Sequence, residues 1–291
     1  MKSKKACDDA GVVAELLKFA PEEFLAELLV LYNQTLRDGI VPETWRATTF
    51  IMLAKKTKAK CTADFRPVAC LRILYKLYAY LLLGRIETTL DAAQPEEQHG
   101  FRSGRRIEEH LLTASLVIER TLAVAMPIWI ISLDLSKAFD RVDWPALWRA
   151  LADQGVSPHI IWNLQCAYYE QLGQVRGDSV DSRSFEILGG VRQGCVLSAR
   201  LFTAVLQWAM SRWREKVRGH GINLEDGGDN LIDLRFADDL LLFAKTAAEA
   251  SWLLDTLVVE LGAVGLILNA KKLLRNVGGS ASSLPRNTRW Y

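Results

Sequence analysis

The chain has 291 residues, of which 50% are hydrophobic and 24% charged, with 36 Lys and Arg against 34 Asp and Glu. This length predicts one or two domains of roughly 150 residues, and the ordinary charged fraction excludes a largely disordered chain. A net charge of +2 means that any attraction to nucleic acid must be local. Five scattered cysteines without a Cys-x-x-Cys pair disfavour a zinc ribbon or a disulfide framework and indicate a reducing compartment. The longest apolar run, 77–83, is too short to cross a membrane, so no membrane partner is expected.

The first part of the chain predicts a helix followed by a strand. Residues 21–38 form an apolar helical face that begins at Pro21 and stops before Gly39. The apolar run 48–54 is rich in β-forming residues and predicts a short strand. We therefore expect an N-terminal helical segment over 1–40.

A basic stretch follows this strand. Residues 46–76 contain eight Lys or Arg and one acid, Asp64, inside a nearly neutral protein. Two interpretations stay open: a solvated loop, or a surface that binds phosphate groups.

The middle of the chain alternates helices and strands. Helices are predicted over 69–90, 107–125 and 198–217, and a buried strand over 128–135. Asp143 and Ser157 are each placed to cap a further helix, and 172–188 resembles a hairpin around Gly177-Asp178.

Two apolar strands, 231–236 and 240–244, lie on either side of a turn at 237–239. Thr246 and Glu249 predict a capping box for a helix that ends near Gly262. A short strand over 266–268 follows, and the chain from Arg275 onward is rich in Gly, Ser and Pro, which predicts poor order. This order of elements predicts an α+β fold with an antiparallel sheet backed by helices.

Three acids fall at the ends of these strands. Asp134 ends the strand 128–135, and Asp238 and Asp239 lie in the following hairpin turn. If the strands are neighbours, three carboxylates meet at one sheet edge, where like charges resist joint ionisation unless a cation is present. Mg²⁺ prefers such ligands together with substrate phosphates, and two ions can clamp a phosphoryl transfer. The alternative is that Asp238 and Asp239 only supply turn chemistry.

The order of motifs is more specific than the acids alone. LDLSKAFDRV, GGVRQGCVLSARLF, RFADDLLLF and GLILNAKK follow one another, after FRPVACLRILYKLYAYLLLGRIE and EEQHGFRSGRRIEEH. This series closely resembles the reverse transcriptases of non-LTR (LINE-like) retrotransposons. The resemblance implies a right-hand polymerase with fingers over 41–125 and a catalytic palm over 126–275. It leaves 276–291 as a disordered tail in which no thumb is recognisable, so the thumb is expected to be missing.

The resemblance implies a two-metal site at the acids. Asp134, the carbonyl group of Leu135, Asp238 and Asp239 correspond to the ligands of two Mg²⁺ ions, with Mn²⁺ as an alternative. Lys272 corresponds to a lysine that protonates the leaving pyrophosphate, and Lys271 is one position away.

The resemblance also implies contacts to substrates. Lys55 and Arg66 correspond to cations that hold the triphosphate, for which the guanidinium fork of Arg is well suited. Gln193 and Gly194 correspond to the loop beneath the nascent base pair. Phe139 corresponds to the ring that excludes a 2′-OH, although core packing would be the better explanation without the motif. Arg102, Arg105 and Arg106 would follow the phosphates of template and primer.

The implied function is RNA-directed DNA polymerase, acting on an RNA template, a DNA primer and dNTPs. Val196 and Ala199 stand where the family has prolines, which loosens the loop at Gln193. Two alternatives stay open: a nucleic-acid-binding retroelement remnant that does not polymerise, and an intron maturase-like reverse transcriptase. An intracellular, nuclear location is expected if the protein takes part in retrotransposition.

Overall fold

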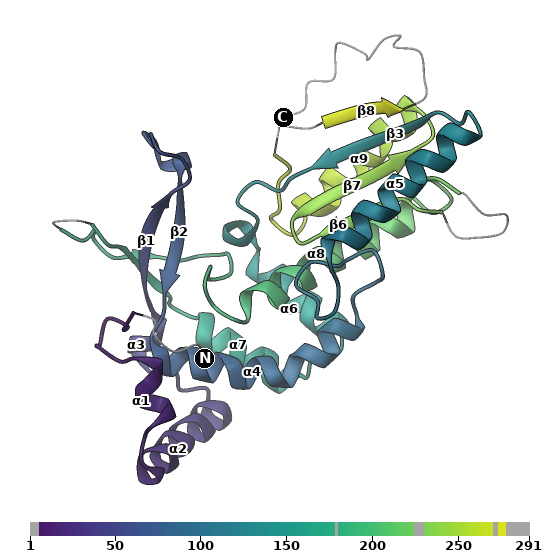
Figure 1. Ribbon diagram of the computed structural model, residues 1–291. Coiled ribbons are helices and arrows are strands. Elements are labelled where there is room, and N and C mark those ends of the chain that lie inside the picture. Colours follow the sequence, from purple (N-terminus) through teal and green to yellow (C-terminus); the bar gives the residue numbers. More distant parts are fainter. Residues whose placement is uncertain (1–5, 178–179, 224–229, 270–272, 278–291) are drawn as a thin grey trace. The chain divides into compact units, whose positions relative to one another are not determined.

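A computed structural model describes residues 6–177, 180–223, 230–269 and 273–277 (Figure 1). The chain divides into two compact units. Unit 1 consists of 1–90 and 148–201, and unit 2 of 91–147 and 202–291. Each unit combines helices with a four-stranded sheet. The boundaries predicted near 40, 125 and 275 separate functional regions, namely the N-terminal segment, fingers, palm and tail, and not compact units. They stay predictions.

Unit 1 is built around an aromatic core. Its sheet has the order β2-β1-β4-β5, formed by β1 (Ala47–Ala54), β2 (Phe65–Cys70), β4 (Leu172–Val175) and β5 (Phe185–Glu186). Its helices are α1 (Ala14–Lys18), α2 (Glu22–Asp38), α3 (Glu43–Arg46), α4 (Ile73–Ala92), α7 (Pro158–Tyr168) and most of α6 (Trp144–Asp153). The rings of Tyr32, Trp45, Tyr75 and Tyr78 pack against one another at centroid distances of 5.4–6.1 Å and are almost completely buried.

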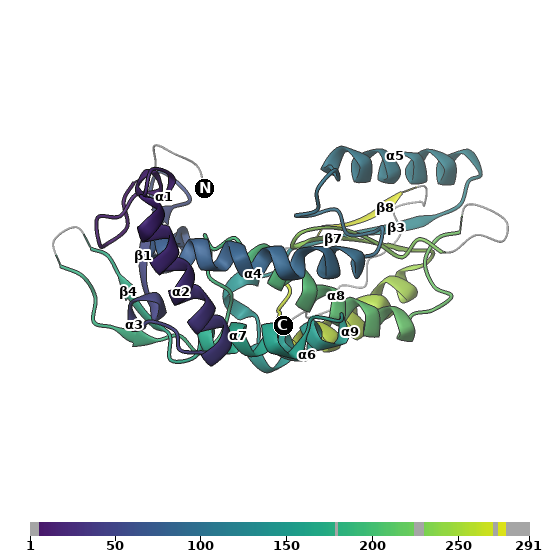
Figure 2. The ribbon, with the colours of Figure 1, turned by 90° about the horizontal axis from the view of Figure 1, so that it is seen from below.

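Unit 2 contains an antiparallel sheet between two layers of helices. The order is β6-β7-β3-β8, formed by β3 (Ile128–Leu133), β6 (Asp233–Phe236), β7 (Asp239–Ala244) and β8 (Leu273–Val277). Helix α5 (Ile107–Ala123) covers one face, and α8 (Ser198–Lys216) and α9 (Ala247–Gly262) cover the other (Figure 2). Val117 of α5 packs on Ile128 and Phe243. Both faces of this sheet are therefore covered, which explains its continuous apolar strands.

The predicted fold class is confirmed, and most predicted elements exist. Asp143 caps α6, because its Oδ2 accepts from Ala146 N at 3.0 Å, and Ser157 caps α7. No helix within the described ranges is long and apolar enough to cross a membrane. All five cysteines are free thiols.

Four local predictions need correction. Residues 65–70 form β2 in antiparallel pairing with β1, so the helix predicted from 69 starts only at Ile73. The strand predicted over 266–268 is a single bridge between Leu135 and Leu268, and the strand β8 includes Asn276 and Val277 of the predicted tail. The carboxylate of Glu249 accepts from Lys245 N rather than from the cap residue Thr246.

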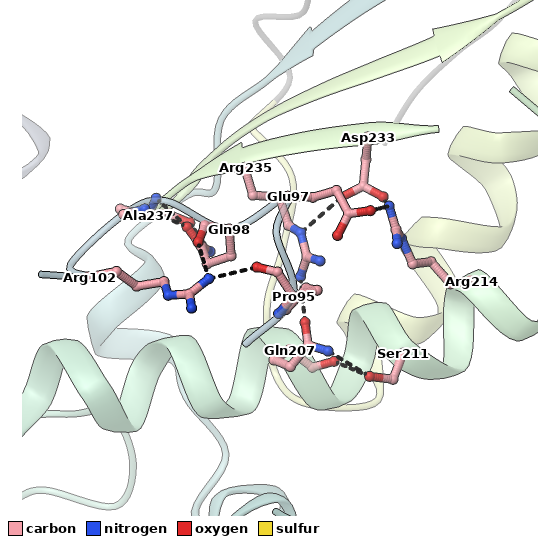
Figure 3. Close-up of polar contacts among 11 residues, drawn as sticks. Pro95, Glu97, Gln98, Arg102, Gln207, Ser211, Arg214, Asp233, Arg235 and Ala237 are labelled. Carbon is pink, nitrogen blue, oxygen red and sulfur yellow. Dashed lines mark hydrogen bonds and ion pairs between the residues drawn. The ribbon is translucent and has the colours of Figure 1, made fainter. Parts of the chain in front are cut away.

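A buried ion network lies under the β6–β7 hairpin (Figure 3). Asp233 and Arg235 of β6 are both fully buried, and Arg235 Nε lies 2.8 Å from Asp233 Oδ2. Arg214 of α8 forms two ion pairs: its Nε lies 2.8 Å from Asp233 Oδ1, and its Nη2 lies 2.7 Å from Glu97 Oε1. Gln207 Oε1 accepts from Arg235 Nη1 at 2.8 Å. Burial lowers the pKa of Arg235, while the nearby carboxylate of Asp233 opposes that shift. The guanidinium therefore depends on its anionic neighbours.

We expect Asp233→Ala to destabilise the protein by about 3–5 kcal/mol, because it leaves the buried Arg235 without its closest counter-charge. Urea unfolding followed by circular dichroism measures the difference. The matched control is Asp38→Ala, which removes the exposed partner of Arg37 and should change the free energy of unfolding far less, because solvent screens an exposed pair. Equal effects of the two variants would contradict a supporting role of the network.

Candidate active site in unit 2

The turn between β6 and β7 carries two of the predicted acids. Phe236 pairs with Asp239, so Ala237 and Asp238 are the two central residues of a tight hairpin. Ala237 has φ +58°, which is unusual for a residue other than glycine. A positive φ at the first central position is a feature of type II′ turns, which match the twist of the flanking strands. The turn therefore presents Asp238 at its tip and Asp239 at the start of β7.

Asp134 lies at the same edge of the sheet. Leu133 pairs with Leu240, and continuing this antiparallel register by one position places Asp134 across from Asp239. Asn269 fixes Asp134 twice. Its Nδ2 donates to Asp134 Oδ2 at 2.8 Å, and its backbone N donates to the Asp134 carbonyl oxygen at 2.7 Å. Asn269 was not predicted as a site residue, although it stands in the quoted motif GLILNAKK.

The carbonyl group of Leu135 has a defined direction. Two hydrogen bonds flank its bridge to Leu268, one from Asn269 N to Asp134 O and one from Ser136 N to Ile267 O. In such a non-hydrogen-bonded pair, the central residue turns its own N–H and C=O away from the partner. The Leu135 carbonyl therefore faces away from 266–269, toward the side of the sheet on which β7 lies.

The three acids interact electrostatically. Burial raises the pKa of Asp239, and the charges of Asp238 and Asp134 raise it further. Asp134 and Asp238 are thus near enough to Asp239 to disfavour its ionised form. No group of three His, Cys, Asp or Glu side chains within the described part of the chain is close enough to form a ready metal site. The donors fit a hard cation in their chemistry, but they do not form a closed cage.

The segment 97–100 supports the turn from the edge of the sheet. Gln98 forms a parallel bridge with Arg235, since His99 N donates to Arg235 O and Arg235 N donates to Glu97 O. The ring of His99 stacks on His110 of α5 at a centroid distance of 3.7 Å. Burial, together with the neighbouring His99, lowers the pKa of His110 to about 4. Residues 97–100 are thus attached to both β6 and α5.

The three arginines that follow this segment differ in their contacts. Arg102 Nη1 donates to the carbonyl groups of Pro95 at 2.8 Å and Gln98 at 3.2 Å (Figure 3). Arg105 pairs with Glu96 and Glu109, whereas the Arg106 side chain is exposed. Arg102 therefore contributes to the loop itself, and the predicted template contacts of the three stay predictions.

Phe139 packs among other rings. It stacks on the buried Phe202 at 5.0 Å and meets Phe101 edge-on at 6.1 Å. Its side chain is half-buried, so one part packs and another is accessible. Both interpretations of Phe139 given above are compatible with these contacts. Lys271 and Lys272 lie outside the described residues.

The other predicted contacts belong to unit 1. Lys55 and Arg66 are exposed on the β1–β2 hairpin. Arg66 pairs with Leu53, so the alternation of side chains places Lys55 and Arg66 on the same face. Gln193 O accepts from Ala69 N at 2.9 Å, and Gly194 has φ +108°. A Cβ at Gly194 would lie 2.9 Å from Ala69 O, so this close backbone approach requires glycine.

Arg192 anchors the loop that carries Gln193. Its buried guanidinium donates to Gln171 Oε1 at 2.9 Å and to the carbonyl groups of Trp45 and Ala167, and it lies 4.6 Å from the Tyr75 ring centroid. Arg192 was not predicted as a site residue, because the sequence does not show whether an arginine within an apolar motif is buried or exposed.

Comparison with known proteins finds matches over most of the chain. The family model described as reverse transcriptase (RNA-dependent DNA polymerase) matches residues 53–276. A Pol polyprotein from the type-2 retrotransposable element R2DM of Drosophila melanogaster is 28% identical over 245 residues, which is 84% of this chain and 22% of that protein. The RNA-directed DNA polymerase from the mobile element jockey of the same organism is 28% identical over 249 residues, 84% of this chain and 26% of that protein.

A solved structure shares the fold. Apo telomerase from Candida tropicalis, truncated from its C-terminal domain, has a TM-score of 0.59 and 14% identity, over 89% of this chain and 56% of that one. This chain spans about a quarter of the length of the two retroelement relatives. The family match covers most of the chain and includes the acids of both motifs, so this chain belongs to the reverse transcriptase family, as its resemblance to the non-LTR retrotransposon enzymes predicted.

Proposed function

We propose that the chain catalyses template-directed addition of dNTPs to the 3′-OH of a DNA primer on an RNA template. One observation carries the proposal: Asp134 and the Asp238-Asp239 turn share one edge of the unit 2 sheet and repel one another electrostatically. A carboxylate cluster of this kind favours a divalent cation, and phosphoryl transfer depends mainly on positioning and electrostatic stabilisation.

Asp134, Asp238 and the carbonyl group of Leu135 would hold the divalent ions, with Asp239 in support. Bound Mg²⁺ or Mn²⁺ would supply charge neutralisation at the triphosphate and activation of the primer hydroxyl. The protein's own part is to orient the ligands. Asn269 holds one oxygen of Asp134 in place, and the hairpin holds Asp238 at its tip.

Contacts to the substrates would come from two kinds of groups. The exposed cations Lys55 and Arg66 share one face of a hairpin, which suits triphosphate oxygens. Phe139 would border the sugar of the incoming nucleotide in unit 2, where Phe202 supports its ring. A ring in that position would select against a 2′-OH.

Asp134→Asn or Asp238→Asn should reduce Mg²⁺-dependent primer extension by about 100-fold or more, because a proposed ligand loses its charge. Extension of a labelled DNA primer on an RNA template measures the rate, and circular dichroism checks the fold. The control is Asp255→Asn on α9, an exposed carboxylate away from the sheet edge. Extension by Asp238→Asn at the wild-type rate would refute the proposed role.

Asp239→Asn should raise the melting temperature in EDTA at pH 7. Because the pKa of Asp239 is raised in the folded state, its ionised form destabilises that state at pH values above the raised pKa. The gain over the wild type should shrink as the pH falls through the raised pKa toward the ordinary value of 3.8. Differential scanning fluorimetry across this range tests both points. A lower melting temperature at pH 7 would contradict the repulsion.

Phe139→Ala should raise ribonucleotide incorporation relative to deoxyribonucleotide incorporation, because the space for a 2′-OH would open. Single-nucleotide extension with matched rNTP and dNTP gives the ratio. If Phe139 only packs on Phe202, the variant should lose about 3–5 kcal/mol of stability with unchanged sugar preference. Unchanged preference in a folded variant would refute the proposed contact.

A further inference from the structure

Gln98 is fully buried, and its side chain contacts the backbone of Ala237 in the turn between β6 and β7 (Figure 3). Its Oε1 accepts from Ala237 N at 3.1 Å and from Gly100 N at 2.8 Å. Its Nε2 makes a long contact of 3.5 Å to the Ala237 carbonyl oxygen. One side chain therefore contacts both backbone polar groups of the residue that precedes Asp238.

Gly100 makes this approach sterically feasible. A Cβ at Gly100 would lie 1.9 Å from Ala237 N and 2.5 Å from Ala237 Cα, so only glycine fits there. Arg102 stabilises the same loop, because its guanidinium donates to the carbonyl groups of Pro95 and Gln98. The backbone of Gln98 is thus also held by Arg102, which makes no hydrogen bond to the turn in the described structure.

The turn needs such support. Ala237 keeps a positive φ without being glycine, and this conformation persists only where surrounding contacts determine it. Gln98, in the adjacent segment, supplies such contacts to Ala237.

We propose that Gln98 is a positioning residue that fixes the Ala237–Asp238 turn, so that Asp238 is held ready to bind a divalent cation beside Asp134. The inference rests on the proposed function, since it assumes that Asp238 binds the ion. It assigns Gln98 and Gly100 of the QHGFR motif to the metal site of the palm-like sheet.

Gln98→Met removes the amide at nearly constant volume. Mutation of a residue that orients a metal ligand typically lowers metal affinity or activity by about 10- to 100-fold. We expect Mn²⁺ binding to weaken within this range. The value of kcat for primer extension should fall, while KM for the dNTP stays within about twofold, because the change affects Asp238 rather than uniform binding of the nucleotide.

The matched control is Gln94→Met. Gln94 is also a buried glutamine of the same loop, and its amide makes no hydrogen bond to the part of the chain that the structure describes. Gln94→Met should bind Mn²⁺ as the wild type does.

Titration of the 291-residue chain with Mn²⁺, followed by electron paramagnetic resonance of the free ion, measures binding without any reaction. Weaker binding in folded Gln98→Met, with wild-type binding in Gln94→Met, supports the inference. A purely structural role predicts a lower melting temperature with unchanged Mn²⁺ affinity and unchanged kcat, and that result would overturn it.

Should Gln98→Met fail to fold, Gln98→Asn replaces it, because it keeps a buried amide on a side chain one methylene shorter, which no longer reaches the amide groups of Ala237 and Gly100. Mn²⁺ binding should again weaken about 10- to 100-fold. Unchanged or tighter binding would overturn the inference.

Asp238→Asn separates this inference from the proposed function. If Asp238→Asn abolishes Mn²⁺ binding and folded Gln98 variants leave it unchanged, the proposed function stands and the positioning role is wrong. If Asp238→Asn binds Mn²⁺ like the wild type, the proposed metal site itself is wrong, and the positioning role falls with it.

Discussion

The register of β3 and β7 brings Asp134 to the same sheet edge as Asp238 and Asp239, and the contacts that support this edge must hold three carboxylates close together. Carboxylates at one sheet edge would separate if their backbones were free to move. Three kinds of contact hold them. The β3–β7 ladder sets the register, Asn269 fixes Asp134, and Gln98 fixes the turn that carries Asp238. A divalent cation bound between these carboxylates would offset the repulsion between their charges.

Buried ion pairs, as well as apolar side chains, hold the β6–β7 hairpin in place. Asp233, Arg235, Arg214 and Glu97 link β6 to α8 and to the segment that contains Gln98. A buried ion pair adds little net stability, but breaking it is costly, and it restricts the packing to geometries that keep charges compensated. The network thereby favours one position of β6 between α5 and α8. The same β6 residue, Arg235, also forms the backbone bridge to Gln98.

The loop that carries Gln193 in unit 1 is held by side chains rather than by prolines. Val196 and Ala199 stand where the family has prolines, and the sequence alone predicts a looser loop. In the structure the buried Arg192 binds three partners on different segments, and Ser198 Oγ donates to Arg192 O at 2.7 Å. These contacts flank Gly194, whose backbone lies close to Ala69. They restrain the loop at a place where the family has prolines to do so.

The amino-acid sequence by itself determined the family, the fold class, most helices and strands, and the three acids, since periodicity, capping residues and short motifs are local signals. Tertiary structure decided which residues support those acids. Gln98 is 139 positions from Ala237 and Asn269 is 135 positions from Asp134, so no local pattern could pair them. The bridge at Leu268 and the strand β8 likewise depend on β3 as a partner. Arg102 illustrates the same limit: its charge predicts a phosphate contact, which stays a prediction, and only the fold shows that its guanidinium also donates to two carbonyl groups of its own loop.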